Sequence, residues 1–240
     1  MCGFTGFTTR STPPDGGVLR AMGDVIRHRG PDDEGYYTDE HCGIAHRRLS
    51  FLDLSNGHQP MSSADGRYII AYNGEAYNYR ELREELIAAG HGFTTNCDTE
   101  VILHGYMEWG PEVTKRLRGM FAFVIWDHQK RELYGARDPF GIKPFYYATM
   151  GELFFFGSEC KSFLPHPGFQ KELNREALKF YLTFQYSALN ESFFKNVFRL
   201  LPGHQLLWRD GAVELSSYHS FSFAPDQTPL DQRAENIRRV

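Results

Sequence analysis

Short apolar runs that end in turns constrain the fold of this chain most. The runs "FAFVIW" and "LYGA" flank the charged stretch "DHQKRE", which is typical of two antiparallel strands joined by a hairpin. With 20 Phe and 13 Tyr among 240 residues, the composition favours a strand-rich core. The runs predicted as strands are Gly3–Thr8, Tyr68–Tyr72, Met120–Trp126, Arg131–Ala136, Phe145–Thr149 and Leu153–Phe156.

Apolar residues at helical spacing predict three helices between these runs. The segment "NYRELREELIAAG" has Asn78 in the N-cap position, Glu81 three residues later and Gly90 as a stop signal. The other two helices carry Val18, Leu19, Met22, Val25 and Ile26 in one case, and Val101, Ile102 and Tyr106 in the other. Helices that are separate from hairpin strands predict an α+β fold, with sheets packed face to face and helices outside.

Charge and cysteine content exclude several classes of function. The formal net charge is -4, with 26 Lys and Arg against 30 Asp and Glu, so no polybasic surface for nucleic acid or anionic lipid is predicted. No apolar run approaches the roughly 18 residues of a membrane-spanning helix, and a secretory signal is missing, so we expect a cytoplasmic protein. The four cysteines are too far apart for a zinc site or a disulfide framework: Cys2, Cys42, Cys97 and Cys160.

Cys2 occupies a position that offers unusual chemistry. If Met1 is removed, this residue carries both a thiol and the free α-amine of the chain. An α-amine has an ordinary pKa of roughly 7.7 to 8.0, so it can serve as a base near neutral pH. The alternative is that Cys2 is a small apolar residue at the start of a strand, and both interpretations are open on position alone.

The stretch "YNGEAYN" contains the donors that a thiol nucleophile needs. Attack on a carboxamide produces an oxyanion, which is stabilised by fixed donors such as a side-chain amide and an unobstructed backbone N–H. Asn73 and Gly74 offer both, directly after the apolar run "YIIAY". Asn-Gly is also the commonest hairpin signal, so a simple turn is the competing interpretation.

A series of motifs resembles the N-terminal glutaminase domain of glutamine-hydrolysing asparagine synthetase. In chain order these motifs are "MCGFTG", "RHRGPDDEG", "AHRRLSFLDLS", "HQPM", "YNGEAYNYRELR", "NCDTEV", "RDPFGIKPFYY", "GSECKSF" and "LLPGH". The resemblance covers Met1 to about Val213. It implies a class II glutamine amidotransferase, which is an N-terminal-nucleophile hydrolase, and a four-layer αββα sandwich of two mostly antiparallel sheets with outer helices.

The resemblance also implies roles for individual residues. Cys2 matches the nucleophile whose own amine is the base, and Asn73 with the Gly74 N–H matches the oxyanion hole. Arg48, rather than Arg47, matches the arginine that binds the α-carboxylate of glutamine. The remaining substrate-binding residues that the resemblance implies are Leu49, Ser50, Phe51 and Leu52, which line the pocket, and Glu75 and Asp98, which bind the ammonium group.

Elementary chemistry agrees with these roles but leaves alternatives. A free amino acid calls for a guanidinium at its carboxylate and carboxylates at its ammonium group. Asp98 could equally cap the helix that follows, and Arg48 could form a surface ion pair. The ten histidines show no metal-ligand spacing, so no metal is expected, and "RDPFGIKPFYY" is predicted to be a turn without a catalytic role. Ala76, Cys97 and Cys160 depart from the usual residues of the family.

The C-terminal part of the sequence differs in character from the rest. We expect a glutaminase domain at residues 1–215, followed at residues 216–240 by a linker and the start of a helix that leads into a synthetase domain. The sequence contains no glycine- and serine-rich loop for the pyrophosphate of ATP, so ATP and Mg are expected only for that further domain and no cofactor for this one.

Three functional readings follow from this organisation. In the first, glutamine is the substrate and ammonia passes to an asparagine-forming synthetase domain. In the second, the same glutaminase serves another amide-forming domain, for a natural-product or polysaccharide precursor. In the third, the domain is a non-enzymatic interaction module, which the intact residues Cys2, Asn73, Gly74, Arg48 and Asp98 disfavour. A homodimer is left open.

Overall fold

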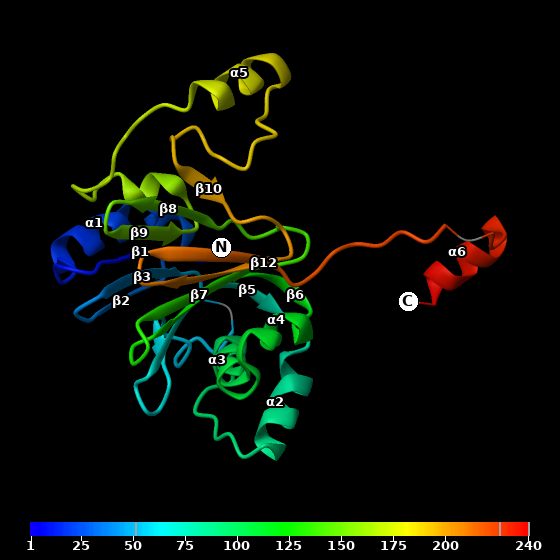
Figure 1. Cartoon of the computed structure of the whole chain (residues 1–240). Helices are drawn as coiled ribbons and strands as arrows, with labels where there is room; N and C mark the ends of the chain where they lie inside the picture. The colour runs from blue at the N-terminus through cyan, green and yellow to red at the C-terminus, as the bar shows by residue number, and fades with distance from the viewer. Residues whose placement is uncertain (51, 226, 240) are drawn as a thin grey trace.

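The computed structural model describes residues 1–50, 52–225 and 227–239. Within these residues, two six-stranded antiparallel sheets lie face to face (Figure 1). One sheet has the order β10-β8-β9-β1-β3-β2 and the other β12-β11-β7-β6-β5-β4. The strands are β1 Gly3–Thr8, β2 Asp33–Thr38, β3 Cys42–Arg48, β4 Met61–Ser62, β5 Tyr68–Ala76, β6 Gly119–Asp127, β7 Glu132–Arg137, β8 Tyr146–Met150, β9 Leu153–Gly157, β10 Val197–Arg199, β11 His204–Arg209 and β12 Ala212–Ser217.

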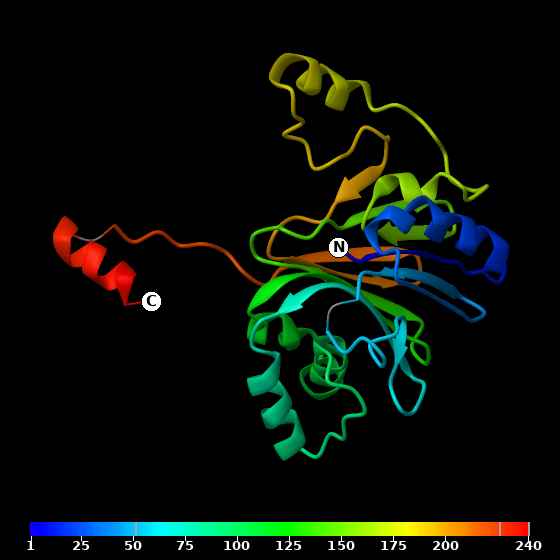
Figure 2. The ribbon, with the colours of Figure 1, turned by 180° about the vertical axis from the view of Figure 1, so that it is seen from behind.

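Helices cover the outer face of each sheet. Figure 2 shows α1 over the first sheet, with α2 and α3 on the far side of the second. The α-helices are α1 Gly16–Val25, α2 Tyr79–Ala88, α3 Asp98–Trp109, α4 Val113–Arg116, α5 Arg175–Phe184 and α6 Leu230–Arg238, and the 3-10 turns are η1 Arg27–Arg29, η2 Gly110–Glu112 and η3 Cys160–Phe163. The predicted α+β sandwich with outer helices is therefore confirmed.

Three apolar clusters hold these four layers together. Between the sheets, Phe4 and Phe154 pack with Trp126, and all three side chains are fully buried. Leu86 of α2 and Ile102 of α3 pack against the outer face of the second sheet, while α1 buries its apolar side on the first sheet. Burial of each large apolar side chain contributes roughly 1.5–3 kcal/mol, so the sandwich supplies a rigid frame for the strand ends.

All six predicted strands exist, but their bounds shift and further strands were missed. Arg131 belongs to the turn before β7, with φ +56°, and not to the strand itself. The strands β2, β3 and β10 to β12, and the short β4, were not predicted. The strand β3 is buried along its whole length, but the charged Arg47 and Arg48 in its sequence are not typical of a buried strand.

Asn78 precedes α2 as predicted, but its side chain does not cap the helix. Its Nδ2 donates to the Arg116 carbonyl at 2.9 Å, and its Oδ1 accepts from the Arg118 N–H at 2.8 Å. The capping-box prediction is therefore wrong in its hydrogen bonds, because Asn78 instead joins the start of α2 to the segment before β6. Gly90, with φ +100°, follows the helix end as expected.

The C-terminal segment leaves the sandwich after β12. In Figure 1 it runs outward and ends in α6, which packs on neither sheet. The division near residue 215 stays a prediction, since β12 itself continues to Ser217. Within the described residues, no helix is long and apolar enough to cross a membrane.

Candidate active site

Cys2 lies immediately before β1, where two backbone contacts hold it. Its Sγ is 3.4 Å from the Leu49 nitrogen and 3.6 Å from the Leu49 carbonyl oxygen. The Nε of Arg29 donates to the Cys2 carbonyl at 2.9 Å. A Cβ on Gly3 would come within 2.7 Å of the Arg29 Cδ, so the glycine after Cys2 leaves room for the arginine. Arg29 is a site residue that the sequence analysis did not single out.

Burial keeps the Cys2 thiol protonated. Removal from water raises the pKa of this thiol, against the lowering effects of the Leu49 hydrogen bond, the N-terminal ammonium, Arg48 and Lys143. Only the thiolate is a strong nucleophile, so attack from this position requires a nearby base.

Lys143 brings "RDPFGIKPFYY" into contact with the N-terminus. Its side chain is 5 % exposed, its Nζ lies 3.2 Å from the Met1 Sδ, and burial lowers its pKa. The carboxylate of Asp138 accepts the N–H groups of Phe140, Ile142 and Lys143 and so shapes the turn. The segment is a turn as predicted, and it also places a buried cation beside the Cys2 region.

The hydrogen bonds of β5 leave one backbone N–H directed at the pocket. Phe121 lies opposite Gly74 on β6; its N–H donates to Asp138 Oδ2, and its carbonyl accepts from the Asp138 N–H. Gly74 therefore directs its own N–H away from β6. Two residues before and after it, the Tyr72 N–H donates to Gln59 and the Ala76 N–H to Asp98. Strand alternation directs the Gly74 N–H to the same edge, between these two bonds.

The Asn73 side chain lies on the face of β5 that is turned toward the other sheet. Ile69 and Ala71, on the same face of the strand, belong to the apolar cluster that also contains Phe4 of β1. Asn73 is 1 % exposed, and its Nδ2 has no hydrogen-bond partner among the described residues. A buried donor without a partner is unfavourable, so this amide is suited to an oxygen that arrives with a ligand. Asn73 and Gly74 are consecutive strand residues, which excludes the simple hairpin-turn interpretation.

Arg48 and Arg47 point to opposite faces of β3. The Arg47 side chain lies under α1 and pairs with Asp24 and Glu34. Arg48 lines the pocket, and its guanidinium donates to three consecutive carbonyls, those of Leu52, Asp53 and Leu54, at 2.7 to 3.2 Å. The surface ion-pair alternative is therefore wrong for Arg48, which is 6 % exposed and organises the loop that borders the pocket.

Two carboxylates lie at the other side of the pocket. Asp98 is the first residue of α3, where its Oδ2 accepts from the Tyr72 hydroxyl at 2.9 Å and the Ala76 N–H at 3.0 Å. Cys97 occupies the N-cap position, so Asp98 is not the cap of its own helix. Burial raises the pKa of Asp98, and burial together with the Asp98 charge raises the pKa of Glu75 to about 7. A cation between these groups would stabilise both ionised forms.

Cys2, Arg48, Gly74, Glu75 and Asp98 line one pocket. Comparisons with known proteins identify the family of the chain. A family model described as "Glutamine amidotransferase domain" matches residues 1–219. The chain belongs to this family. It is 43 % identical over 243 residues to "Asparagine synthetase [glutamine-hydrolyzing] 1" of Bacillus subtilis (strain 168), a match that covers 99 % of this chain and 38 % of that protein. It is also 34 % identical to "Amidase chry2" of Gibberella zeae, over 98 % of this chain and 36 % of that protein.

Solved structures support the amidotransferase fold. The glutamine phosphoribosylpyrophosphate amidotransferase from B. subtilis superimposes with a TM-score of 0.64 at 19 % identity, over 91 % of this chain and 49 % of that one. This likeness shows the N-terminal-nucleophile hydrolase fold. The chain spans about two fifths of the length of the first curated relatives that it matches.

The pocket has an open volume of about 340 Å³, mouth included. Its lining residues are Cys2, Arg48, Leu49, Leu52, Gly57, Gln59, Tyr72, Gly74, Glu75, Cys97, Asp98 and Thr99. Asn73 and Ser50 are not among them. The Ser50 N–H donates to Asp32, and Phe51 lies outside the described residues. Gln59 was missed, although "HQPM" was a motif of the resemblance: its Oε1 accepts from the Tyr72 N–H and its Nε2 donates to Thr99.

The pocket offers no histidine as a base. None of its lining residues is a histidine, and the buried His46 is engaged with the Tyr72 carbonyl at 2.9 Å. Burial lowers the pKa of His46 to about 4, so the ring is neutral at pH 7. Within the described ranges, no group of three or more His, Cys, Asp or Glu side chains is placed to hold a metal ion.

Proposed function

We propose that this domain hydrolyses glutamine to glutamate and ammonia, with Cys2 as the nucleophile after removal of Met1. The observation that carries the proposal is the joint placement in one pocket of the Cys2 thiol, the Gly74 N–H edge of β5 and the groups that suit an amino acid. Arg48 supplies the cation for the α-carboxylate. Glu75 and Asp98 supply the anions for the ammonium group.

In the proposed reaction, the free α-amine of Cys2 takes the thiol proton while sulfur attacks the side-chain carbonyl carbon. Asn73 Nδ2 and the Gly74 N–H donate to the resulting oxyanion. Collapse breaks the C–N bond, and the protonated α-amine returns its proton to the departing ammonia. The amine then takes a proton from water, whose oxygen attacks the thioester. Breakage of the C–S bond releases glutamate and restores the thiol.

Glutamate release by the purified chain tests this proposal directly. With Met1 removed, as shown by intact mass, we expect glutamate and ammonia in equal amounts without ATP, aspartate or magnesium. The physical reason is that a thioester at Cys2 needs only water for turnover. Absence of glutamate release from fully processed, folded protein would refute the proposed hydrolysis.

We further propose that the ammonia serves ATP-dependent asparagine synthesis in a longer protein. Support comes from the relatives named as asparagine synthetases, of which this chain matches about two fifths. In that protein, residues 1–215 form the glutaminase domain, residues 216–240 lead to the synthetase domain, and ATP with Mg acts in the latter. The chain without that domain should form no asparagine.

A different acceptor is the second candidate, because the relative named "Amidase chry2" matches almost as much of this chain. The extended protein should be supplied with glutamine, ATP, magnesium and either aspartate or other carboxylic acids. Asparagine formation would support the first candidate. Amidation of another acid, with aspartate ignored, would replace it by the second.

Removal of either charge at the ends of the pocket should weaken glutamine capture. We expect Arg48→Ala and Asp98→Asn each to raise KM by roughly 30-fold or more, which corresponds to about 2 kcal/mol for a broken buried charge pair. Asp98→Asn is the sharper variant, because an amide oxygen can still accept from Tyr72 and Ala76. Steady-state kinetics provide the measurement, with Asp231→Asn on the exposed α6 as the control. An unchanged KM in Asp98→Asn would remove this residue from substrate binding.

Glutamine capture should depend on pH through Glu75. The folded-state pKa of Glu75 is raised from 4.5 to about 7, so the side chain loses its charge as pH falls through about 7, and KM should rise there. In Glu75→Gln this rise in KM should flatten.

A raised carboxyl pKa also disfavours folding as pH increases from 4.5 to 7. The Glu75→Gln substitution should therefore stabilise the free protein by about 1 kcal/mol at pH 8 and by nothing at pH 4, allowing for solvent screening. Urea unfolding at both pH values measures this difference, and equal stabilisation at both would contradict it.

A further inference from the structure

Buried polar atoms without partners recur at the end of the sandwich opposite to Cys2. Among the described residues, Thr8 Oγ1, His41 Nε2 and Trp208 Nε1 are buried and make no hydrogen bond, and the same is true of Asn73 Nδ2. Cys2 precedes β1 and Thr8 ends it, so the six residues of the strand separate the two places by about 20 Å. This second group is therefore distinct from the glutamine pocket.

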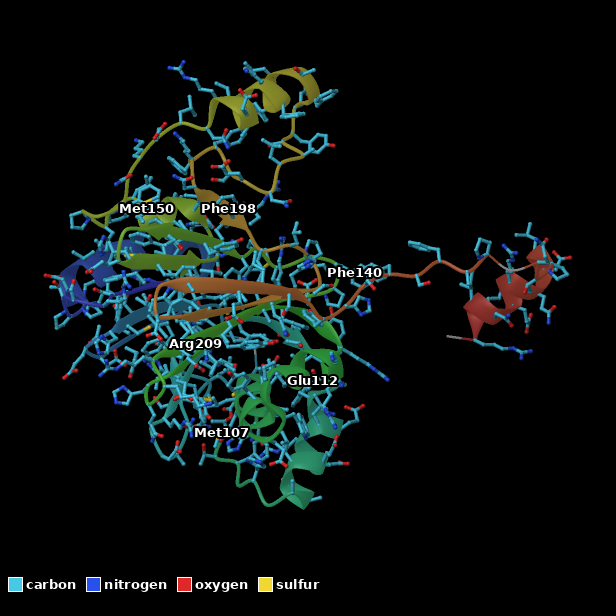
Figure 3. All side chains as sticks on the ribbon, viewed as in Figure 1. Met107, Glu112, Phe140, Met150, Phe198 and Arg209 are labelled. Carbon is cyan, nitrogen blue, oxygen red and sulfur yellow. The ribbon has the colours of Figure 1, made fainter. Side chains whose placement is uncertain are left out.

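Strand register brings four chain segments together at this end. Thr8 pairs with Cys42, so the end of β1 lies beside the β2–β3 turn. Arg209 pairs with both Glu132 and Ala212, which places the β6–β7 and β11–β12 turns next to each other. In Figure 3, Arg209 marks this end of β11, away from Phe140 at the other end of β7.

A pocket between these turns has an open volume of about 480 Å³, mouth included. Its lining residues are Thr9, Arg10, His41, Arg131, Trp208 and Asp210. Trp208 is 3 % exposed, and its indole ring stacks on Phe154 in the core at a centroid distance of 6.0 Å. The ring is thus fixed beside the pocket, and its Nε1 is buried without a hydrogen-bond partner.

Two arginines line the pocket and can donate hydrogen bonds into it. Neither the Arg10 nor the Arg131 guanidinium forms a hydrogen bond or ion pair within the described part of the chain. Gly211, with φ +86°, lets Arg10 lie over the β11–β12 turn, since a Cβ there would be 3.2 Å from the Arg10 Nη1. His41 Nε2 has only the Glu40 carboxylate at 3.9 Å. Asp210 is the single carboxylate of the lining.

We propose that this pocket binds a small oxyanion, a phosphate or carboxylate group, through Arg10 and Arg131, beside the indole ring of Trp208. Guanidinium groups bind such oxygens in bidentate fashion. The Trp208 ring lines the same pocket, so its indole resonance should sense a bound anion. The site does not depend on the glutaminase chemistry.

The indole N–H resonances of the protein report on the site directly. The chain has three tryptophans, so a ¹H–¹⁵N spectrum of the full chain shows three indole signals, and Trp208→Phe assigns one of them. Titration with inorganic phosphate, and separately with acetate, should shift the Trp208 signal saturably. The two titrations distinguish phosphate from carboxylate as the preferred group.

Charge variants make the test specific. Arg10→Gln and Arg131→Gln should each lower the affinity for the anion by about tenfold, as expected for loss of a charge-assisted hydrogen bond. Arg175→Gln, at an exposed position of α5, should leave the affinity unchanged. Asp210→Asn should tighten binding by removing a like charge. A Trp208 signal that neither anion shifts would overturn the proposal, as would equal binding in the Arg10, Arg131 and Arg175 variants.

Discussion

Replacement of Cys2 by serine is expected to lower the rate of glutamine hydrolysis by about 10⁴-fold or more, the scale of losing a nucleophile in other hydrolases. The thiol is already difficult to ionise in this site because burial raises its pKa, and a hydroxyl in the same place is far less acidic. Glutamate release measures the loss. Cys160→Ser is the matched control, since Cys160 is a half-buried free thiol that does not line the pocket, and it should keep full activity.

The same reasoning predicts that Met1 must be removed for activity. With Met1 in place, the nitrogen of Cys2 is an amide and cannot accept a proton, and no histidine of the pocket lining can substitute for it. A protein with a non-removable residue before Cys2 should therefore be folded, as judged by circular dichroism, but inactive. Full turnover by a preparation whose intact mass retains Met1 would eliminate the α-amine as the base.

Asn73→Ala is expected to lower kcat by roughly 100- to 1000-fold with little change in KM, as for oxyanion-hole donors elsewhere. The reason is that the Nδ2 of Asn73 has no other partner in the described protein, so its hydrogen bond is available to the oxygen that becomes charged. Rapid-quench or steady-state kinetics at saturating glutamine provide the measurement.

Alkylation of Cys2 separates this effect from a general disturbance of the site. Reaction of the thiol with iodoacetamide forms no oxyanion, so Asn73→Ala should alkylate at the rate of the unsubstituted protein while hydrolysis falls. If hydrolysis stayed at the original rate, Asn73 would not be the oxyanion donor. If alkylation slowed to the same extent as hydrolysis, the substitution would have displaced Cys2 and the donor role would lose its support.

Much of the sandwich could be predicted from local patterns. The strands with long apolar runs, such as β1 and β6, and the three amphipathic helices were found because their periodicity reflects burial against a sheet. The strand β3 was missed because charge normally marks a surface, whereas Arg47 and Arg48 are buried through pairings with distant segments. The period of two in that strand then separates the two arginines onto opposite faces.

The sequence by itself determined that a thiol and an α-amine can belong to one residue, because this follows from the position of Cys2 behind Met1 alone. The motifs also indicated Asn73 and Gly74 as donors. Only the tertiary structure decided where those donors point. The Gly74 N–H faces the pocket because the backbone of Phe121, opposite it, is hydrogen-bonded to Asp138 instead. Asp98 reaches β5 because α3 begins there. Such contacts join residues far apart in the chain, so no local pattern can encode them.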